Sequence, residues 1–182
     1  TEAIGDRRGG RGDAWTGQLR AQDIANRERQ EVTMESDAVP IHPLRLCKEV
    51  RDFIDRDAVL VVDGHEILNF GRQSIPSFTA GSRLNSGPFG NIGTGVPFGI
   101  AAKVARPDKQ VIVLTGDGSF GFNGIELESA VRQGINIITV ISNNGGWAGE
   151  AFSKKDTEQG RFLGFNSYEK MAEAFGGYGE RV

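Results

Sequence analysis

From residue 58 onward, the hydrophobic residues gather in short unbroken runs and do not alternate with polar ones. Three such runs, at residues 58–62, 110–115 and 136–141, are rich in valine and isoleucine, and each leads into Gly, Asp, Asn or Ser. Runs without alternation are typical of strands that are covered on both faces, as in a parallel sheet. We therefore predict three parallel strands whose carboxyl ends form one polar edge.

Segments with helical spacing precede these runs and lie between them. Pro43 suits the first position of a helix, and the apolar face of that helix includes Cys47, which we expect to be a core residue. Further helices are predicted over residues 96–104, 124–133 and 167–175. The alternation predicts an α/β fold, a doubly wound and mainly parallel sheet with helices on both faces. In such sheets, ligands bind outside the carboxyl ends of the strands.

The first forty residues have a different character. Residues 1–13 are polar, rich in Gly and Arg, and aperiodic, which favours a loop or a disordered segment. Residues 14–36 carry mixed charge with few apolar anchors, which indicates a helical linker that lies on a surface. We predict residues 1–40 to be a linker or tail from a preceding domain. We expect residues 41–182 to be one domain that is cut short at its C-terminus, in a piece of a longer polypeptide. The alternative is a trimmed chain with natural ends.

Composition narrows the function classes. The chain has 182 residues, with 21 basic and 24 acidic side chains and a net charge of −3. This balance leaves no basic footprint for nucleic acid or for an anionic membrane, and no apolar stretch is long enough to span a bilayer. One cysteine excludes an internal disulfide and a multi-cysteine zinc site. Without a targeting signal, the expected location is cytoplasmic. The 26 glycines indicate either a flexible chain or many positions at which the backbone must lie close to another group.

Two polar loops follow neighbouring predicted strands. Residues 116–119 read Gly-Asp-Gly-Ser, where the glycines admit an anion but Asp117 would repel a bare phosphate unless a divalent cation joins them. Taken alone, this motif is also a good turn. Residues 143–146 read Asn-Asn-Gly-Gly and offer an amide oxygen and a free carbonyl. Together the loops supply three oxygens and one negative charge, which suits octahedral Mg²⁺ with two phosphate oxygens and a water.

This pair of motifs resembles the signature of the thiamine-diphosphate-dependent enzymes. Residues 90–108 look like the segment that grips the aminopyrimidine in decarboxylases and acetolactate-synthase-like enzymes, and the likeness to the diphosphate-binding domain covers residues 41–182. Residues 83–90 and 116–128 are most similar to the branch of 2-hydroxyacyl-CoA lyase and oxalyl-CoA decarboxylase. Asn85 and Asn123 depart from this branch, which has Asp and Ser at these positions. The residues after Asp117 also depart from it, since they are Gly-Ser where the branch often has Ser-Ala.

The resemblance implies roles at the magnesium and diphosphate end of the cofactor. Asp117 and Asn144 would bind Mg²⁺ through their side chains, and Gly146 would bind it through its carbonyl. Gly118 and Ser119 would contact the diphosphate. Because the three magnesium ligands come from both polar loops, the resemblance places the metal ion between these loops.

The resemblance also implies roles for residues nearer the amino end. The turn of Gly64, His65 and Glu66 would line the diphosphate side. The Gly90 carbonyl would accept from the 4′-amino group, and Ile92 would be the apolar wedge under the thiazolium. Thiamine chemistry needs the two rings folded into a V, which such a wedge enforces. Its own flanks alone would favour a core residue at Ile92, and only the whole set of motifs favours the wedge.

Other candidates carry two interpretations each. His65 could be an acid/base group, or a loop histidine with one structural hydrogen bond. Trp147, which we count among the cofactor-binding residues, and Phe152 could wall a substrate pocket or pack against the sheet. Lys154 and Lys155 could meet a CoA phosphate or lie in a solvated loop.

The implied function is a thiamine-diphosphate- and Mg²⁺-dependent carbon–carbon lyase. The favoured reaction is that of a 2-hydroxyacyl-CoA lyase, which cleaves its acyl-CoA substrate to formyl-CoA and an aldehyde or ketone. Alternatives are acetolactate synthase-like chemistry, 2-oxoacid or oxalyl-CoA decarboxylation and, from another class, a non-enzymatic flavodoxin-like nucleotide-binding domain. Nothing in this chain matches the activating glutamate of the family. We therefore expect it from a pyrimidine-binding domain of the same or a partner subunit, in a homodimer or homotetramer.

Overall fold

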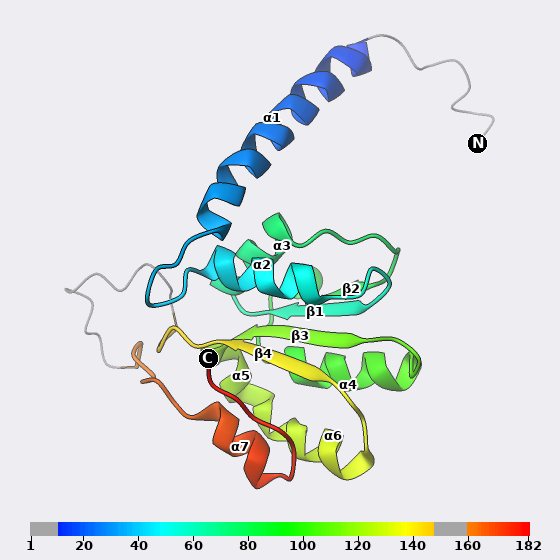
Figure 1. Ribbon diagram of the computed structural model, residues 1–182. Helices are drawn as coiled ribbons and strands as arrows, with labels where there is room; N and C mark the ends of the chain where they lie inside the picture. The colour runs from blue at the N-terminus through cyan, green and yellow to red at the C-terminus, as the bar shows by residue number, and fades with distance from the viewer. Residues whose placement is uncertain (1–10, 148–159) are drawn as a thin grey trace.

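One parallel sheet organises the molecule. The computed structural model describes residues 11–147 and 160–182, and Figure 1 shows the sheet between two layers of helices. In the described part, four strands pair in parallel in the order β2-β1-β3-β4. The strands are β1 (Val59–Asp63), β2 (Arg83–Leu84), β3 (Val111–Gly116) and β4 (Ile138–Ser142). The predicted fold class is confirmed, and the three predicted strands correspond to β1, β3 and β4.

Helices lie on both faces of this sheet (Figure 1). One face carries α2 (Pro43–Phe53) and α3 (Glu66–Ser74), and the other carries α4 (Gly95–Ala105) and α6 (Leu127–Gln133). The remaining elements beyond α2 are η2 (Gly87–Phe89), α5 (Asp117–Asn123), η3 (Gly124–Glu126) and α7 (Tyr168–Ala174). The helices predicted at residues 96–104 and 167–175 correspond to α4 and α7.

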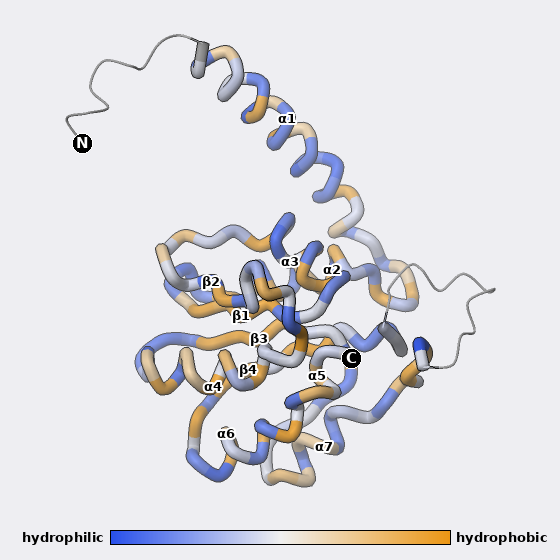
Figure 2. The backbone as a smooth tube through the Cα atoms, turned by 180° about the vertical axis from the view of Figure 1, so that it is seen from behind, coloured by the Kyte–Doolittle hydropathy of each residue, from blue (hydrophilic) through white to orange (hydrophobic). Residues whose placement is uncertain are grey.

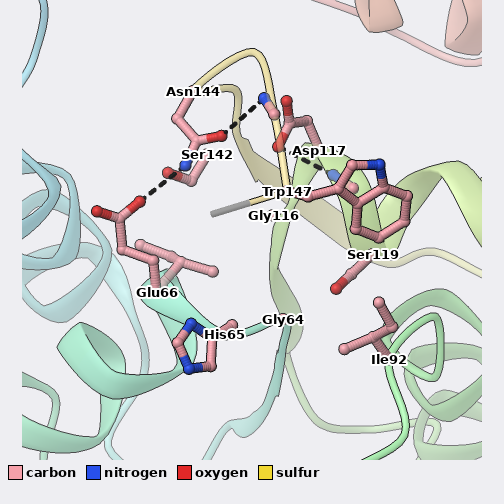
Figure 3. Close-up of a pocket in the computed structure, with 13 residues that line it drawn as sticks. Gly64, His65, Glu66, Ile92, Gly116, Asp117, Ser119, Ser142, Asn144 and Trp147 are labelled. Carbon is pink, nitrogen blue, oxygen red and sulfur yellow. Dashed lines mark hydrogen bonds between the residues drawn. The ribbon is translucent and has the colours of Figure 1, made fainter. Parts of the chain in front are cut away.

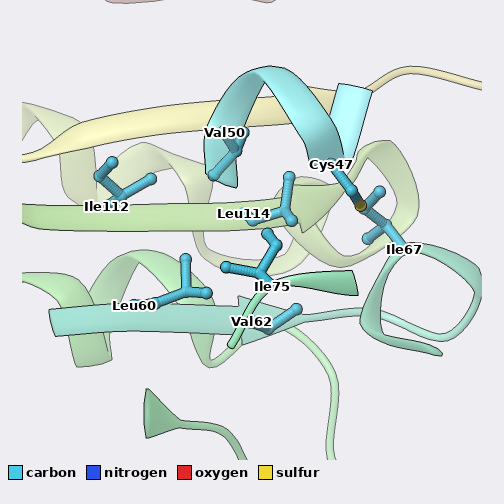
Figure 4. Packing of buried hydrophobic residues seen from close by; sticks show 8 residues of the cluster. All are labelled: Cys47, Val50, Leu60, Val62, Ile67, Ile75, Ile112 and Leu114. Atoms are coloured by element: carbon cyan, nitrogen blue, oxygen red, sulfur yellow. The ribbon is translucent and has the colours of Figure 1, made fainter. Parts of the chain in front are cut away.

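The core is densest between the sheet and the helices α2 and α3. Figure 2 shows the hydrophobic residues concentrated in the strands at the centre of the molecule. Eight buried residues from β1, β3, α2, α3 and the residue after α3 form one cluster (Figure 4). They are Cys47, Val50, Leu60, Val62, Ile67, Ile75, Ile112 and Leu114. The prediction that Cys47 is a core residue is confirmed, because its side chain is fully buried.

Helix α4 packs closely against the opposite face of the sheet. A Cβ atom placed on Gly99 would lie 2.4 Å from Cγ2 of Val113 in β3, which is far inside normal contact. Only glycine lets the helix backbone approach the strand this closely. This close packing therefore fixes the distance between the sheet and the loop that precedes α4.

The N-terminal segment forms the helix α1 (Arg11–Met34), which Figure 1 shows projecting from the sheet. The expected helix is confirmed, but the loop expected over residues 1–13 is wrong from residue 11 onward, since the helix begins there. The side chains of residues 12–29 are exposed, and Met34 packs at the base of the helix. That α1 is a linker lying on another part of the protein, and that a domain boundary falls near residue 40, stay predictions.

Two local predictions need correction, and two elements were not predicted. The helix expected over residues 124–133 is a turn of η3 followed by α6, and helical structure already begins at Asp117 in α5. Glu66, expected in a turn, is the first residue of α3. Neither α3 nor the short strand β2 was predicted from the sequence.

Candidate functional site

A pocket lies where the carboxyl ends of β1, β3 and β4 meet, at the predicted polar edge (Figure 3). We call it the carboxyl-edge pocket. Its lining residues are Gly64, His65, Glu66, Ile67, Ile92, Gly116, Asp117, Gly118, Ser119, Ser142, Asn144, Gly146 and Trp147. Every residue predicted for the site belongs to this set except Gly90.

Asp117 is the buried charge of the pocket. Its residue is only 2% exposed, and its Oδ1 accepts a hydrogen bond from the N–H of Gly118 at 2.9 Å. Its Oδ2 is buried and has no hydrogen-bond partner within the part of the chain that the structure describes. Burial raises the pKa of this carboxyl, and the N–H groups of Gly118, Gly145 and Gly146 oppose that rise. An unpartnered buried carboxylate oxygen is costly, and a bound cation would relieve that cost.

A glycine lets the backbone beside Asp117 pack closely against one wall of the pocket. Strand β3 ends at Gly116 and α5 begins at once with Asp117, so the carboxylate sits in the first turn of a helix, where negative charge is favoured. Gly118 is buried, and a Cβ atom on it would lie 3.0 Å from Cε3 of Trp147. The interpretation of this motif as a simple turn is therefore wrong, because Asp117 starts a helix and Gly118 leaves room for the Trp147 ring.

The second polar loop reaches the pocket through Asn144. Its Oδ1 accepts from the N–H of Gly146 at 3.1 Å, and its Nδ2 donates to Oε2 of Glu66 at 2.8 Å (Figure 3). The same loop is tied to a later segment, because Trp147 N–H donates to the Arg161 carbonyl at 3.0 Å. The two predicted polar loops do meet at one edge of the sheet.

These donors fit a hard divalent cation. The Asp117 carboxylate, the Asn144 amide oxygen and the Gly146 carbonyl are oxygen ligands, which Mg²⁺ prefers. Residues 11–147 and 160–182 contain no group of three or more His, Cys, Asp or Glu side chains that could hold a metal. A cation at this edge would therefore depend on mixed carboxylate, amide and carbonyl oxygens. The unpartnered Oδ2 of Asp117 is the observation that shows the fit.

The loop that carries Ile92 is anchored by hydrogen bonds to a buried carboxylate. Oδ2 of Asp63, at the end of β1, accepts from the N–H groups of Gly93 at 3.0 Å and Gly95 at 2.8 Å. Asp63 is 3% exposed, and burial raises its pKa against the opposing effect of these backbone donors. The carboxylate supplies from another element the cap that α4 lacks locally, since Thr94 makes no side-chain cap.

The same loop is also tied to α5. Nδ2 of Asn123 donates to the Gly93 carbonyl at 2.7 Å. Asn123 is one of the positions that depart from the lyase branch, and the structure gives it this bridging contact. Sequence reasoning missed Asp63, although an acid at the end of an apolar strand was the available signal. It also missed Ile67, Gly116 and Ser142 in the pocket lining.

The remaining candidates fall in different places. Trp147 is 38% exposed, and its ring stands edge-on to Phe122 with centroids 5.5 Å apart, so it walls the pocket and is not packed against the sheet. His65 is an exposed pocket residue whose side chain does not cap α3. Gly90 lies in an exposed left-handed turn at φ 64°, outside the pocket lining. Phe152, together with Lys154 and Lys155, lies outside the described residues.

One predicted exclusion concerns membranes. No helix in the portion of the chain that the structure describes combines the length and apolar character needed to cross a bilayer. The longest of these helices, α1, is strongly polar.

The fold and the pocket together define a cofactor-binding α/β domain. Residues 69–182 match the family model of the thiamine pyrophosphate enzyme, C-terminal TPP binding domain. The chain belongs to this family of thiamine-diphosphate-dependent enzymes. This membership replaces the flavodoxin-like alternative.

Relatives with different activities match almost the whole chain. It is 33% identical over 177 residues to an acetolactate synthase large subunit of Mycobacterium tuberculosis. This alignment covers 92% of this chain and 31% of that protein. The chain is 32% identical over 183 residues to a 2-hydroxyacyl-CoA lyase of Arabidopsis thaliana, covering 93% of this chain and 32% of the lyase. The chain thus spans about a third of the length of these curated relatives.

A solved structure shares the fold. The thiamine diphosphate-dependent 4-hydroxybenzoylformate decarboxylase of Rhodococcus jostii RHA1 superposes with a TM-score of 0.69 at 29% identity, over 78% of this chain and 27% of the decarboxylase. The names of these three proteins specify different reactions, and the decarboxylase is named as thiamine diphosphate-dependent.

Proposed function

We propose that this chain forms the magnesium and diphosphate half of the active site of a thiamine-diphosphate-dependent carbon–carbon lyase. The observation that carries the proposal is the buried Oδ2 of Asp117, which has no partner in the described residues and belongs to a residue that lines the pocket at the carboxyl edge of the sheet. Burying that charge without a counter-ion would be unfavourable. A magnesium ion shared with a diphosphate would balance it.

The residues of the two polar loops would divide the work between metal and phosphate. Asp117, Asn144 and Gly146 would hold Mg²⁺ through a carboxylate, an amide and a carbonyl oxygen. Gly118 and Ser119, in the first turn of α5, would contact the diphosphate. The bound cofactor supplies a ring carbon that attacks a carbonyl group and then accepts the electron pair of the broken bond.

Other lining residues would shape the organic end of the site. Ile92 would stand as the wedge between the two rings, held in place by the loop that Asp63 anchors. The Gly90 carbonyl would accept from the cofactor's amino group. Gly64 and His65 would line the diphosphate side, and Trp147 would exclude water from one wall.

The favoured reaction is cleavage of a 2-hydroxyacyl-CoA to formyl-CoA and an aldehyde or ketone. Its support is the likeness of residues 83–90 and 116–128 to the lyase branch, together with the relative named 2-hydroxyacyl-CoA lyase. The acetolactate synthase relative, at 33% identity, supports acetolactate synthesis as a second candidate. In either case the activating glutamate would come from a pyrimidine-binding domain of the same or a partner subunit in a homodimer or homotetramer.

Two measurements on the full-length protein test the proposal. Calorimetric titration with thiamine diphosphate should show binding that depends on Mg²⁺, and Asp117→Ala should weaken that binding at least tenfold, about 1.4 kcal/mol. Unchanged affinity in this variant would contradict the metal assignment. Incubation with a 2-hydroxyacyl-CoA should yield formyl-CoA and a carbonyl compound in equal amounts. Acetolactate from pyruvate without formyl-CoA would instead select the second candidate.

A further inference from the structure

A hydrogen bond across the carboxyl-edge pocket joins Glu66 to Asn144. Asn144 lies in the loop after β4, and Glu66 is the first residue of α3, 78 positions earlier in the chain. Nδ2 of the amide donates to Oε2 of the carboxylate at 2.8 Å. At the other end of the same amide, Oδ1 accepts from the N–H of Gly146 at 3.1 Å (Figure 3).

These two hydrogen bonds determine the orientation of the Asn144 amide, with its nitrogen toward Glu66 and its oxygen toward Gly146. A turned-over amide would place its oxygen against the Glu66 carboxylate and its NH₂ group against the N–H of Gly146. Both hydrogen bonds would then be replaced by repulsive contacts, and a bond to an ionised acceptor is roughly twice as strong as one between neutral groups. Glu66 therefore holds the oxygen of Asn144 on the side of Gly146.

The side on which the oxygen lies matters because only the oxygen of an amide can bind a magnesium ion. The N–H of Gly146, which the amide oxygen contacts, also acts on the Asp117 carboxylate. The amide oxygen of Asn144 and the carboxylate of Asp117 thus share the N–H of Gly146 as a neighbour. The Glu66 carboxylate itself would repel a diphosphate, so its contact with Asn144 gives this acid a different use from the predicted diphosphate contact.

We infer that Glu66 is a positioning residue that orients the Asn144 amide so that its oxygen faces the magnesium site. The inference rests on the proposed function, because it assigns a partner to one of the proposed metal ligands. Groups that orient metal ligands in this way characteristically affect metal affinity by about 10- to 100-fold.

The test compares the Mg²⁺ concentration that gives half-maximal binding of thiamine diphosphate, measured by calorimetry on variants of the full-length protein. Glu66→Met removes the acceptor with little change in length, and it should raise that concentration about tenfold or more. Glu66→Gln keeps an acceptor oxygen and should stay within about threefold of the wild type. Asn69→Met, one turn further along the exposed side of α3, is the matched control and should change nothing.

A second background separates orientation from a general structural effect. Asn144→Asp offers an oxygen at both ends of the side chain, so orientation no longer matters. In that background, Glu66→Met should cost less than about twofold, which a merely structural role of Glu66 would not produce. This comparison also holds if Glu66→Met alone is poorly folded, because each background has its own reference.

Different results overturn different statements. If wild-type binding of thiamine diphosphate does not depend on Mg²⁺, the proposed function fails and the inference falls with it. If wild-type binding does depend on Mg²⁺ but Glu66→Met is unchanged, only the inference is refuted. Equal losses in Glu66→Gln and Glu66→Met, or the same loss in both backgrounds, would also refute it, because charge or folding would then explain the effect.

Discussion

A single methyl group at Gly118 tests whether the backbone of α5 approaches the cofactor directly. Gly118→Ala would place a Cβ atom 3.0 Å from Cε3 and 3.1 Å from Cζ3 of Trp147. Gly121→Ala is the matched control in the same helix, since a Cβ atom there would meet nothing within 4 Å. The two substitutions are chemically identical and differ in whether they reach the pocket.

The structure gives a magnitude for each variant. Gly121→Ala should raise the free energy of unfolding by about 0.5–1 kcal/mol, because alanine in a helix loses less backbone entropy than glycine. Gly118→Ala gains the same amount but must displace the Trp147 ring by several tenths of an ångström, and overpacking costs about 1–3 kcal/mol. Because that ring is partly exposed and can shift, the low end applies and the two effects nearly cancel.

Binding should separate the two variants far more than stability does. In Gly118→Ala, the new methyl group and the displaced ring both change the pocket lining beside the backbone that we propose contacts the diphosphate. We expect an affinity for thiamine diphosphate at least tenfold lower, about 1.4 kcal/mol, and no change for Gly121→Ala. Calorimetry at saturating Mg²⁺ and chemical denaturation of the full-length protein measure both quantities. Equal affinities in the two variants would refute the close approach of backbone to cofactor.

Three further predictions concern the framework of the site. Burial raises the pKa of Cys47 to about 11, so at pH 8 only roughly one thiol in a thousand is ionised, and mass spectrometry should find its peptide unlabelled by iodoacetamide until the protein unfolds. Rapid labelling under native conditions would disprove this burial. Gly99→Ala, with its Cβ 2.4 Å from a Val113 methyl group, should lower the free energy of unfolding by about 1–3 kcal/mol in denaturant titrations, and a neutral result would mean that α4 can move away from β3. Burial raises the pKa of Asp63, so folding favours its protonated form; the stability it contributes is present below about pH 3.9 and is lost as the pH rises through the raised pKa. Asp63→Asn should therefore weaken the fall in unfolding free energy above that pH, whereas an unchanged pH profile would contradict the raised pKa.

Strands β1 and β3 were predictable because burial on both faces leaves a direct trace in the sequence. Residues 59–62 of β1 and 111–114 of β3 are all buried, and all of them are apolar. Strand β4 is only partly buried, although the prediction expected it to be covered on both faces. Helix α3 left a weaker trace. Gly71 in its middle reads as a helix breaker, yet a Cβ atom there would lie 3.2 Å from Cγ1 of Val62, so glycine is the residue that lets α3 lie close to the sheet. Its presence reflects tertiary packing, which periodicity does not record.

The meeting of the two polar loops was also predictable, because carboxyl ends of neighbouring parallel strands lie at one edge. The contacts within that edge were not. The hydrogen bond between Glu66 and Asn144 depends on how closely the start of α3 approaches the loop after β4. The hydrogen bond between Gly93 and Asp63 requires the Ile92 loop to pass the end of β1. Residue types and spacing indicate which chemistry an edge can host. Side-chain partners separated by many residues follow only from the packed structure.

The anchoring of Gly93 and Gly95 by Asp63 has a consequence for how this domain can diversify. The position of the Ile92 loop is determined by a carboxylate on β1, thirty residues earlier, and not by the path of the intervening chain. Insertions or deletions in the exposed stretch at residues 77–81 should therefore leave Ile92, the wedge we propose, undisturbed. The outer contour of the domain could change in this way without moving Ile92 relative to the loop that carries Asn144.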